Sequence, residues 1–183
     1  MELTFFGAAR TTTGSMYRLQ ARGAAVLLDC GLYQGHYRDT YARNSSLPFD
    51  PRSIDACILS HAHLDHSGNL PTLMRGGFGG NVWSTSGTRD LCAAMLRDAA
   101  NIQEQDAAYL NRKRDHLHEE PVPPLYSVAD ATRSLGLFVD LCYERPFQVA
   151  PGVVGTFYDA GHILGSAIVA LDLESEPPLR LCY

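Results

Sequence analysis

The most constraining feature of the sequence is a cluster of metal-ligating residue types that directly follows an apolar segment. Residues 54–59 are predicted to form a buried strand, and the cluster His61-x-His63-x-Asp65-His66 comes just after it. Side chains two residues apart share a face only in an extended chain, so a helix would point His61 and His63 apart. Imidazole and carboxylate groups bind zinc and similar divalent ions. The spacing therefore predicts a metal-binding loop at a strand end, where His61 and His63 bind one ion and Asp65 and His66 bind another.

A catalytic zinc usually has three protein ligands and a water, so the first two histidines of the cluster need a third partner. His162 is the best candidate, because glycines and small residues flank it in a loop between two predicted strands. A loop histidine with no ligand role is the alternative interpretation of His162. His36 is a weaker candidate. His116 and His118 are also weaker, because they stand in a polar run beside basic residues and are expected to be solvated.

Asp29 stands at the end of another predicted strand, two residues before Gly31. Two roles are open for its carboxylate. It could accept the second N–H of a ligand histidine and so orient the ring, or it could simply form a turn before the glycine. The hydroxyl residues at positions 11, 12, 13 and 15 could line the same site, but the favoured interpretation is that they satisfy the polar groups of their own loop.

Short apolar segments followed by helical periodicity and then by further apolar segments predict a layered α/β (α+β) domain. The predicted strands are residues 3–6, 16–20, 24–30, 54–59, 81–85, 139–143, 153–158, 167–173 and 179–183. A short helix is expected after Asn69, a long helix capped by Ser86 or Thr88, and a third helix capped by Ser127. The apolar side of the long helix is expected to be formed by Leu91, Met95, Ala99, Ile102 and Tyr109. Residues 31–51 and 111–124 are expected to be irregular.

Composition and missing motifs argue against several classes of protein. The formal net charge of −5 argues against a strongly basic nucleic-acid-binding module, although bound metal ions would add positive charge. The 5 cysteines form no Cys-x-x-Cys pair, which favours reduced thiols in a cytoplasmic protein. The sequence has neither a Gly-Lys-Ser/Thr phosphate loop nor a Gly-x-Ser-x-Gly elbow. It also has no apolar run near the roughly 18 residues of a membrane span, and its first residues are not those of a secretion signal.

The segment His-Ala-His-Leu-Asp-His-Ser-Gly at residues 61–68 resembles the metal signature of the metallo-β-lactamase superfamily. Other stretches resemble the β-CASP branch of this superfamily, which consists of nucleic-acid-processing nucleases; they are residues 7–15, 28–35, 98–104 and 159–167. The last of these, with Gly-His-Ile-Leu-Gly-Ser, is the most discriminating and points to the RNA-processing members. The resemblance spans nearly the whole chain and is poorer over residues 111–124.

The resemblance implies an αββα sandwich, in which two sheets face each other, helices cover the outside and the metal site lies at one edge. It further implies a set of ligands for two Zn2+ ions: His61, His63 and His162 for the first, Asp65 and His66 for the second, and Asp29 behind them as the orienting residue. Two such ions, about 3.5–4 Å apart, stabilise in-line attack of a hydroxide on phosphorus. Asp65 would also handle the proton of that hydroxide. The implied function is zinc-dependent hydrolysis of phosphodiester bonds in RNA, by an endonuclease or a 5′-exonuclease.

Members of this branch continue, after the strand that matches residues 179–183, into a Ser-Gly-Asp segment whose aspartate bridges both ions. A β-CASP domain and further histidines follow. From the resemblance we expect residues 1–183 to be the amino-terminal portion of a metallo-β-lactamase-like domain, without the β-CASP domain. We expect this portion to be inactive or feeble by itself.

Two other functions stay open. One is hydrolysis of a small ester, thioester, lactone or small phosphodiester on the same fold, which leaves residues 161–166 and the long helix without explanation. The other is a non-catalytic scaffold subunit, which would be expected to have lost ligands, yet every ligand that this segment could hold is present. RNA is the expected partner, and no membrane is. The sequence leaves open whether DNA is also a substrate and whether the protein forms a homodimer.

Overall fold

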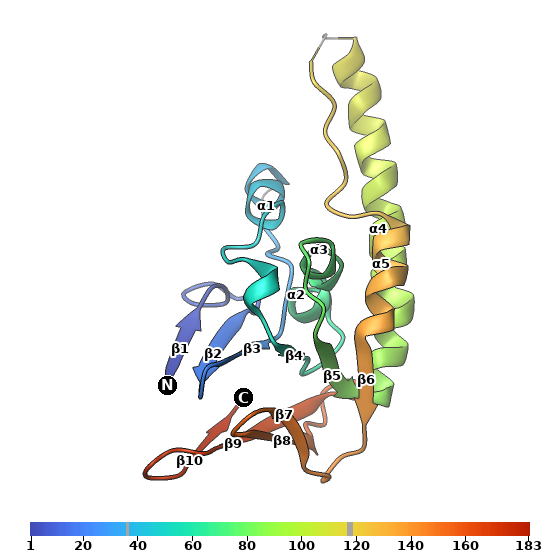
Figure 1. The fold of residues 1–183 in the computed structure, drawn as a ribbon. Coiled ribbons are helices and arrows are strands. Elements are labelled where there is room, and N and C mark those ends of the chain that lie inside the picture. The colour runs from blue at the N-terminus through green and yellow to red at the C-terminus, as the bar shows by residue number, and fades with distance from the viewer. Residues whose placement is uncertain (36, 117–118) are drawn as a thin grey trace.

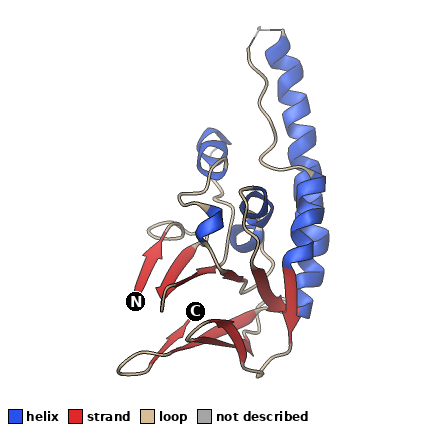
Figure 2. Ribbon diagram, viewed as in Figure 1, coloured by secondary structure: helices blue, strands red, loops and turns tan. Residues whose placement is uncertain are grey.

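The computed structural model describes all residues of the chain except 36 and 117–118 (Figure 1). Two β-sheets face each other, and the helices pack on the outer side of the larger sheet (Figures 1 and 2). The larger sheet has the strand order β1-β2-β3-β4-β5-β6, and the smaller one has the order β10-β9-β8-β7. The predicted pair of facing sheets is therefore present. Among the described residues, however, no helix covers the outer face of the smaller sheet, so the layers seen are helix, sheet and sheet.

The strands are β1 (Glu2–Phe5), β2 (Tyr17–Ala21), β3 (Ala24–Leu28), β4 (Ala56–Ile58), β5 (Asn81–Thr85), β6 (Phe138–Leu141), β7 (Phe147–Ala150), β8 (Val153–Asp159), β9 (Ala167–Leu173) and β10 (Leu179–Cys182). The helices are α1 (Tyr37–Asn44), α2 (Leu64–Ser67), α3 (Leu70–Arg75), α4 (Ser86–Asp115) and α5 (Val128–Ser134), with 3₁₀ turns η1 (Pro51–Ser53) and η2 (Leu135–Leu137). Every strand expected from the sequence is present, and β5 and β9 have the expected bounds.

Three elements were not expected from the sequence. Helix α1 lies in a stretch predicted to be irregular, α2 is one turn inside the histidine cluster, and β7 adds an edge strand to the smaller sheet. None of the three carries a long apolar periodicity, because each is short. Their positions are therefore set by the elements around them.

The long helix α4 differs from the prediction at both ends. Its N-cap is Thr85, whose side chain accepts a hydrogen bond from the Thr88 backbone N–H, so neither Ser86 nor Thr88 is the cap. It also continues to Asp115, into the run expected to be a break. Three basic residues in its last turn suit the negative end of the helix dipole. Ser127 caps α5 as predicted, in a capping box with Asp130.

Strand β3 separates the two cores of the protein. Its residues are all buried, and alternate side chains point to opposite faces of the sheet. Leu27 packs in the cluster beneath the helices, while Val26 and Leu28 pack in the cluster between the two sheets. β3 pairs in parallel with β4, and β4 with β5. The carboxyl ends of these strands therefore meet at one edge of the sheet, which is where the chain places its functional loops.

Helix α4 is only partly packed against the body of the protein. Its first half buries Cys92, Leu96 and Ala100 in the core beneath the helices. Its second half extends beyond the sheet, beside the segment that returns to α5 (Figure 1). Ile102 and Tyr109, which were predicted to face the core, are 50% and 51% exposed there. No helix in the described part of the chain has the length and apolarity needed to cross a membrane.

Candidate metal centre

The histidine cluster begins just beyond the end of β4. His61 and His63 lie in the loop between β4 and α2, and His63 is the N-cap residue of α2, with a φ of −54° and a ψ of 143°. Asp65 and His66 lie on the single turn of α2 that follows. The predicted loop at the strand end is therefore present, and the helical turn explains how Asp65 and His66 face the same region. A strand end followed by one helical turn presents four ligand-type side chains within six residues.

His162 comes from the loop between β8 and β9 and meets the cluster from the opposite sheet. Its Nε2 lies 3.3 Å from Nδ1 of His63, and Nε2 of His61 lies 3.2 Å from the same atom. One ring nitrogen from each of the three histidines lies within 4.8 Å of the others. This arrangement matches what a single divalent ion requires of three imidazole ligands. The structure thus brings together the three residues that the sequence analysis grouped.

His66 adjoins this trio without being part of it. Its ring lies 4.0 Å from the ring of His61, measured between centroids. Its Nε2 is 3.7 Å from a carboxylate oxygen of Asp65, so these two side chains face each other on α2. Asp65 and His66 therefore stand as a pair beside the three histidines.

Asp29 lies fully buried beneath His66. Because a carboxylate can only accept hydrogen bonds, Nδ1 of His66 donates to Oδ2 of Asp29, at 2.5 Å. Asp29 also accepts from the backbone N–H and the hydroxyl of Ser60, at 2.8 and 2.9 Å. The sequence left Asp29 with two roles, and the structure favours the orienting one. Its backbone also makes the turn, with a φ of 56°.

Asp29 has two further partners, of which the sequence analysis missed Tyr183 and considered Ser15 only as the less favoured alternative. Tyr183 donates its hydroxyl hydrogen to Oδ2 of Asp29 at 2.5 Å, and its oxygen lies 2.5 Å from the hydroxyl of Ser15. Ser15 also donates weakly to Asp29, at 3.4 Å. The favoured interpretation of Ser15 as a purely local loop residue is therefore wrong. No local pattern could have revealed Tyr183, because 154 residues separate it from Asp29.

The loop that carries His162 is held by the beginning of α4. Thr85 and Thr88 both donate side-chain hydrogen bonds to the carbonyl of Gly165, at 2.6 and 2.8 Å. Within the loop, the hydroxyl of Ser166 accepts from the backbone N–H of His162 at 3.1 Å. Thr85 therefore caps α4 and also holds the loop that carries His162. Sequence analysis assigned Thr88 to capping alone and gave Thr85 no role.

The histidines differ in protonation because their surroundings differ. Burial, followed by the charge of His66, lowers the pKa of His61 to about 4. Burial alone would also lower the pKa of His66, but the hydrogen bond and the charge of Asp29 outweigh it and raise that pKa. His61 is therefore neutral at physiological pH and has a lone pair to offer a metal ion.

The remaining histidines do not join this site in the structure. His116 is the exposed C-cap residue of α4, at the end of the helix that extends away from the sheets (Figure 1). His36 and His118 lie outside the described residues. Thr11 and Thr13 line a separate cavity, which is described below.

Comparison with known proteins identifies the family. Residues 9–140 match the Metallo-beta-lactamase superfamily. The chain is 36% identical over 169 residues to Ribonuclease TTHA0252 of Thermus thermophilus, an alignment covering 92% of this chain and 34% of the relative. It is 35% identical over 173 residues to Transcription termination factor FttA of Methanothermobacter thermautotrophicus, covering 93% and 25%. This chain thus spans only a quarter to a third of the length of these relatives.

Solved structures with low sequence identity share the fold. The HARLDQ motif mutant S60 of a Cronobacter sakazakii metallo-beta-lactamase has a TM-score of 0.57 at 19% identity, covering 98% of this chain and 57% of that one. BJP-1, a subclass B3 metallo-beta-lactamase of Bradyrhizobium japonicum, has a TM-score of 0.55 at 15% identity, covering 94% and 56%. The names of the sequence relatives agree with the RNA-processing branch that the motifs resembled. Together with the family match and the histidine geometry, these findings show that the chain belongs to the metallo-β-lactamase superfamily.

Proposed function

We propose that this chain is the amino-terminal part of a zinc-dependent hydrolase that cleaves phosphodiester bonds in RNA. The observation that carries the proposal is the convergence of His61, His63 and His162, whose ligand atoms lie within 4.8 Å of one another. The choice of RNA is supported by relatives named as a ribonuclease and as transcription termination factors, which align with more than nine tenths of this chain. Whether cleavage is internal or proceeds from a 5′ end is left to experiment.

The donor set fits zinc. Three imidazole nitrogens form a typical protein share of a catalytic zinc site, which keeps its fourth position for water. The lowered pKa of His61 keeps its ring neutral, as a ligand must be. We propose one Zn2+ at these three histidines. We propose a second at Asp65 and His66 in the longer protein, where further ligands would complete the coordination.

The side chains of this chain would divide the chemistry between them. Zn2+ bound at the histidines would supply Lewis-acid activation of water and stabilisation of charge on the phosphoryl group. Asp29 accepts a hydrogen bond from Nδ1 of His66, so that in the neutral ring the lone pair is on Nε2 and is available to a metal ion. Asp65 is partly exposed beside the trio, and we assign its carboxylate the role of accepting the proton of the attacking water.

The first experiment measures zinc in the purified 183-residue chain by elemental analysis. We expect a stoichiometry near one, because the second set of ligands has only Asp65 and His66 here. The His63→Ala variant should lose this ion. The His116→Ala variant should retain it, because His116 lies at the far end of α4. A chain that binds no zinc, or a His63→Ala variant that binds as much as the native chain, would contradict the proposed site.

The second experiment tests the reaction with the longer protein. Single-stranded RNA labelled at either end should be cleaved, and a chelator should abolish the cleavage. The order of the products distinguishes an endonuclease from a 5′-exonuclease. Turnover of a small ester, thioester or lactone without RNA cleavage would favour the alternative hydrolase, and zinc binding without any turnover would favour a scaffold subunit. A DNA strand of the same sequence and light scattering address DNA cleavage and homodimer formation.

The cytoplasm is the setting we propose for this function. All five cysteines are free, and Cys30, Cys57 and Cys92 are buried as ordinary core residues. Such unpaired thiols are typical of a reducing compartment. The proposed substrate, RNA, is also present in the cytoplasm.

A further inference from the structure

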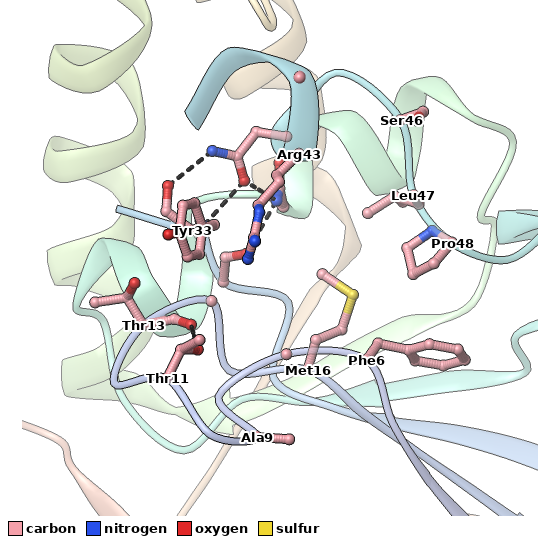
Figure 3. Close-up of a pocket in the computed structure, with 16 residues that line it drawn as sticks. Phe6, Ala9, Thr11, Thr13, Met16, Tyr33, Arg43, Ser46, Leu47 and Pro48 are labelled. Atoms are coloured by element: carbon pink, nitrogen blue, oxygen red, sulfur yellow. Dashed lines mark hydrogen bonds between the residues drawn. The ribbon is translucent and has the colours of Figure 1, made fainter. Parts of the chain in front are cut away.

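A cavity of about 410 Å³ lies between the loop that joins β1 to β2 and the end of α1 (Figure 3). Two segments form most of its walls: the loop between β1 and β2, and the end of α1 with the residues that follow it. Its volume falls in the range of sites for small ligands, about 300–1,000 Å³. None of the proposed metal ligands lines this cavity, so its lining residues have a role other than the reaction proposed above.

The two sides of the cavity differ in chemistry. Tyr33, Thr11 and Thr13 form a polar and aromatic side (Figure 3). Met16, Leu47 and Phe6 lie together across from Tyr33 and form an apolar side. The ring of Phe6 is packed against Phe49, with 5.0 Å between centroids, so this wall is held in place. A ligand with one charged end and one flat apolar end would match both sides.

Arg43 stands between these two sides. It projects from the last turn of α1, and its guanidinium lies 4.3 Å from the centroid of the Tyr33 ring. Arg43 is exposed. Stacking on Tyr33 holds the plane of its guanidinium. A guanidinium held in this way is suited to binding a phosphate group.

The cavity is joined to the metal centre through shared backbone. Gly31 lines the cavity, and a Cβ placed on it would lie 1.7 Å from the carbonyl oxygen of Asp65. The N–H of Ser15 donates to that same carbonyl at 2.8 Å. Only a thickness of backbone therefore separates the cavity wall from the segment that bears Asp65 and His66.

From this arrangement we propose that the cavity binds one nucleotide of a single-stranded RNA substrate, next to the nucleotide whose phosphodiester is cleaved. Arg43 contacts a phosphate, and the base lies against Met16 and Leu47. RNA-binding sites commonly combine a cation for the backbone with an apolar or stacking surface for the base. The inference rests on the proposed RNA substrate, and it assigns Arg43 to substrate binding rather than to chemistry.

The test measures binding of a fluorescent single-stranded oligouridine by the 183-residue chain in the presence of chelator, so that no cleavage interferes. Arg43→Gln should weaken binding about tenfold, the effect of losing one charged hydrogen-bonding contact. The slope of log K against log salt should become shallower by about 0.7, the value for one phosphate contact on a single strand. Arg43→Lys, which keeps the charge but not the fork, should recover part of the affinity.

The matched control is Arg145→Gln. Arg145 is exposed in the turn between β6 and β7 and has no part in the cavity. Its replacement should change neither the affinity nor the salt slope. Photocrosslinking of 4-thiouridine in the same RNA should label peptides that contain residues 33–48. Native affinity and slope in Arg43→Gln, or no RNA binding by the native chain, would overturn the proposal.

These outcomes are separable from failure of the proposed function. If the longer protein cleaves RNA in a zinc-dependent reaction and Arg43→Gln changes neither binding nor cleavage, the nucleotide site is wrong and the nuclease stands. If oligouridine binds in an Arg43-dependent manner but no RNA is cleaved, the nucleotide site stands and the hydrolase proposal is wrong.

Discussion

Asp29 and His66 are joined by a hydrogen bond of 2.5 Å that connects the end of β3 to the turn of α2. The carboxylate is completely buried, and its other acceptor positions are filled by Ser60 and Tyr183. A metal ligand held in this way has a fixed ring orientation and a fixed tautomer. This bond connects the hydrogen-bonded framework of the fold to the candidate metal centre.

The first prediction concerns this carboxylate. Asp29→Asn keeps the size of the side chain and tolerates the positive φ, but it removes the negative charge. In the longer protein we expect the affinity for the second ion, which His66 is proposed to bind, to fall by about 10–100-fold, as for other partners of ligand histidines. A competition titration against a zinc chelator measures the change. The control is Asp172→Asn, which removes an exposed carboxylate paired with Arg180. Equal zinc affinities in the two variants would rule out the orienting role.

The second prediction compares two glycines in the loop of His162. Both have positive φ, 64° at Gly161 and 80° at Gly165. A Cβ at Gly161 meets nothing within 4 Å, whereas one at Gly165 would lie 2.2 Å from the Thr88 backbone nitrogen. Gly161→Ala should therefore cost about 1–2 kcal/mol of unfolding free energy, from backbone strain alone.

Gly165→Ala should cost about 1–3 kcal/mol more, because the loop must move away from α4. Since that movement displaces His162, zinc affinity should fall in this variant and stay close to native in Gly161→Ala. Urea unfolding and chelator competition give the two numbers. Similar losses in both variants would show that the contact with α4 does not position the histidine.

The third prediction concerns the pair of threonines that share one acceptor. Thr85→Val and Thr88→Val each remove one donor to the Gly165 carbonyl and leave the other in place. Each should cost about 1–2 kcal/mol, the range for a lost cap or hydrogen bond. The double variant should lose more than the sum, because the carbonyl then has neither threonine as a donor. A double-mutant cycle by thermal unfolding measures the coupling, and strict additivity would contradict it.

The fourth prediction is a pH dependence of the metal-free protein. Burial and the charge of His66 lower the pKa of His61 to about 4, while the unfolded value is about 6.5. Between these values the unfolded chain binds the extra proton, so stability falls as pH drops from about 6.5 to about 4. His61→Gln should have a shallower slope in this window. Urea unfolding in the presence of chelator measures it, and an unchanged slope would refute the assignment.

His66 acts in the opposite direction. Burial alone would lower its pKa, but Asp29 raises it above the unfolded value. Its contribution to stability is therefore complete below about pH 6.5 and is lost as pH rises through the folded pKa. The two shifts together predict that the combined contribution of His61 and His66 to the stability of the metal-free protein is largest close to pH 6.5.

Much of the fold was predictable because its strands are short apolar segments bounded by turn residues. The bounds of β5 and β9 agree with the sequence prediction, and Ser127 caps α5 as expected. The exposed positions of Ile102 and Tyr109 were not predictable, because helical periodicity shows which side chains share a face but not whether anything packs on that face. The second half of α4 extends beyond the end of the sheet, so Ile102 and Tyr109 remain exposed (Figure 1).

The sequence by itself determined the local part of the metal centre. Spacing places His61 and His63 on the same face of any extended chain. The small residues that flank His162, and the family resemblance of residues 159–167, predicted His162 as the third ligand. Only the tertiary structure decided that these residues meet. His162 and His63 are 99 residues apart in sequence, so local geometry does not bring them together. Their contact depends on the packing of the two sheets against each other and on the hydrogen bond that Thr85 donates to the carbonyl of Gly165.

The surroundings of Asp29 show the same division. Sequence alone could not choose between a turn-forming and an orienting carboxylate, because both roles require an aspartate at a strand end. In the folded chain Ser60 and His66, which follow β4, and Tyr183, which follows β10, donate hydrogen bonds to the carboxylate of Asp29. These hydrogen bonds favour the orienting role. The pairing of β3 with β4 brings Ser60 and His66 to the buried carboxylate, and the facing of the two sheets brings Tyr183, so these hydrogen bonds depend on the tertiary structure.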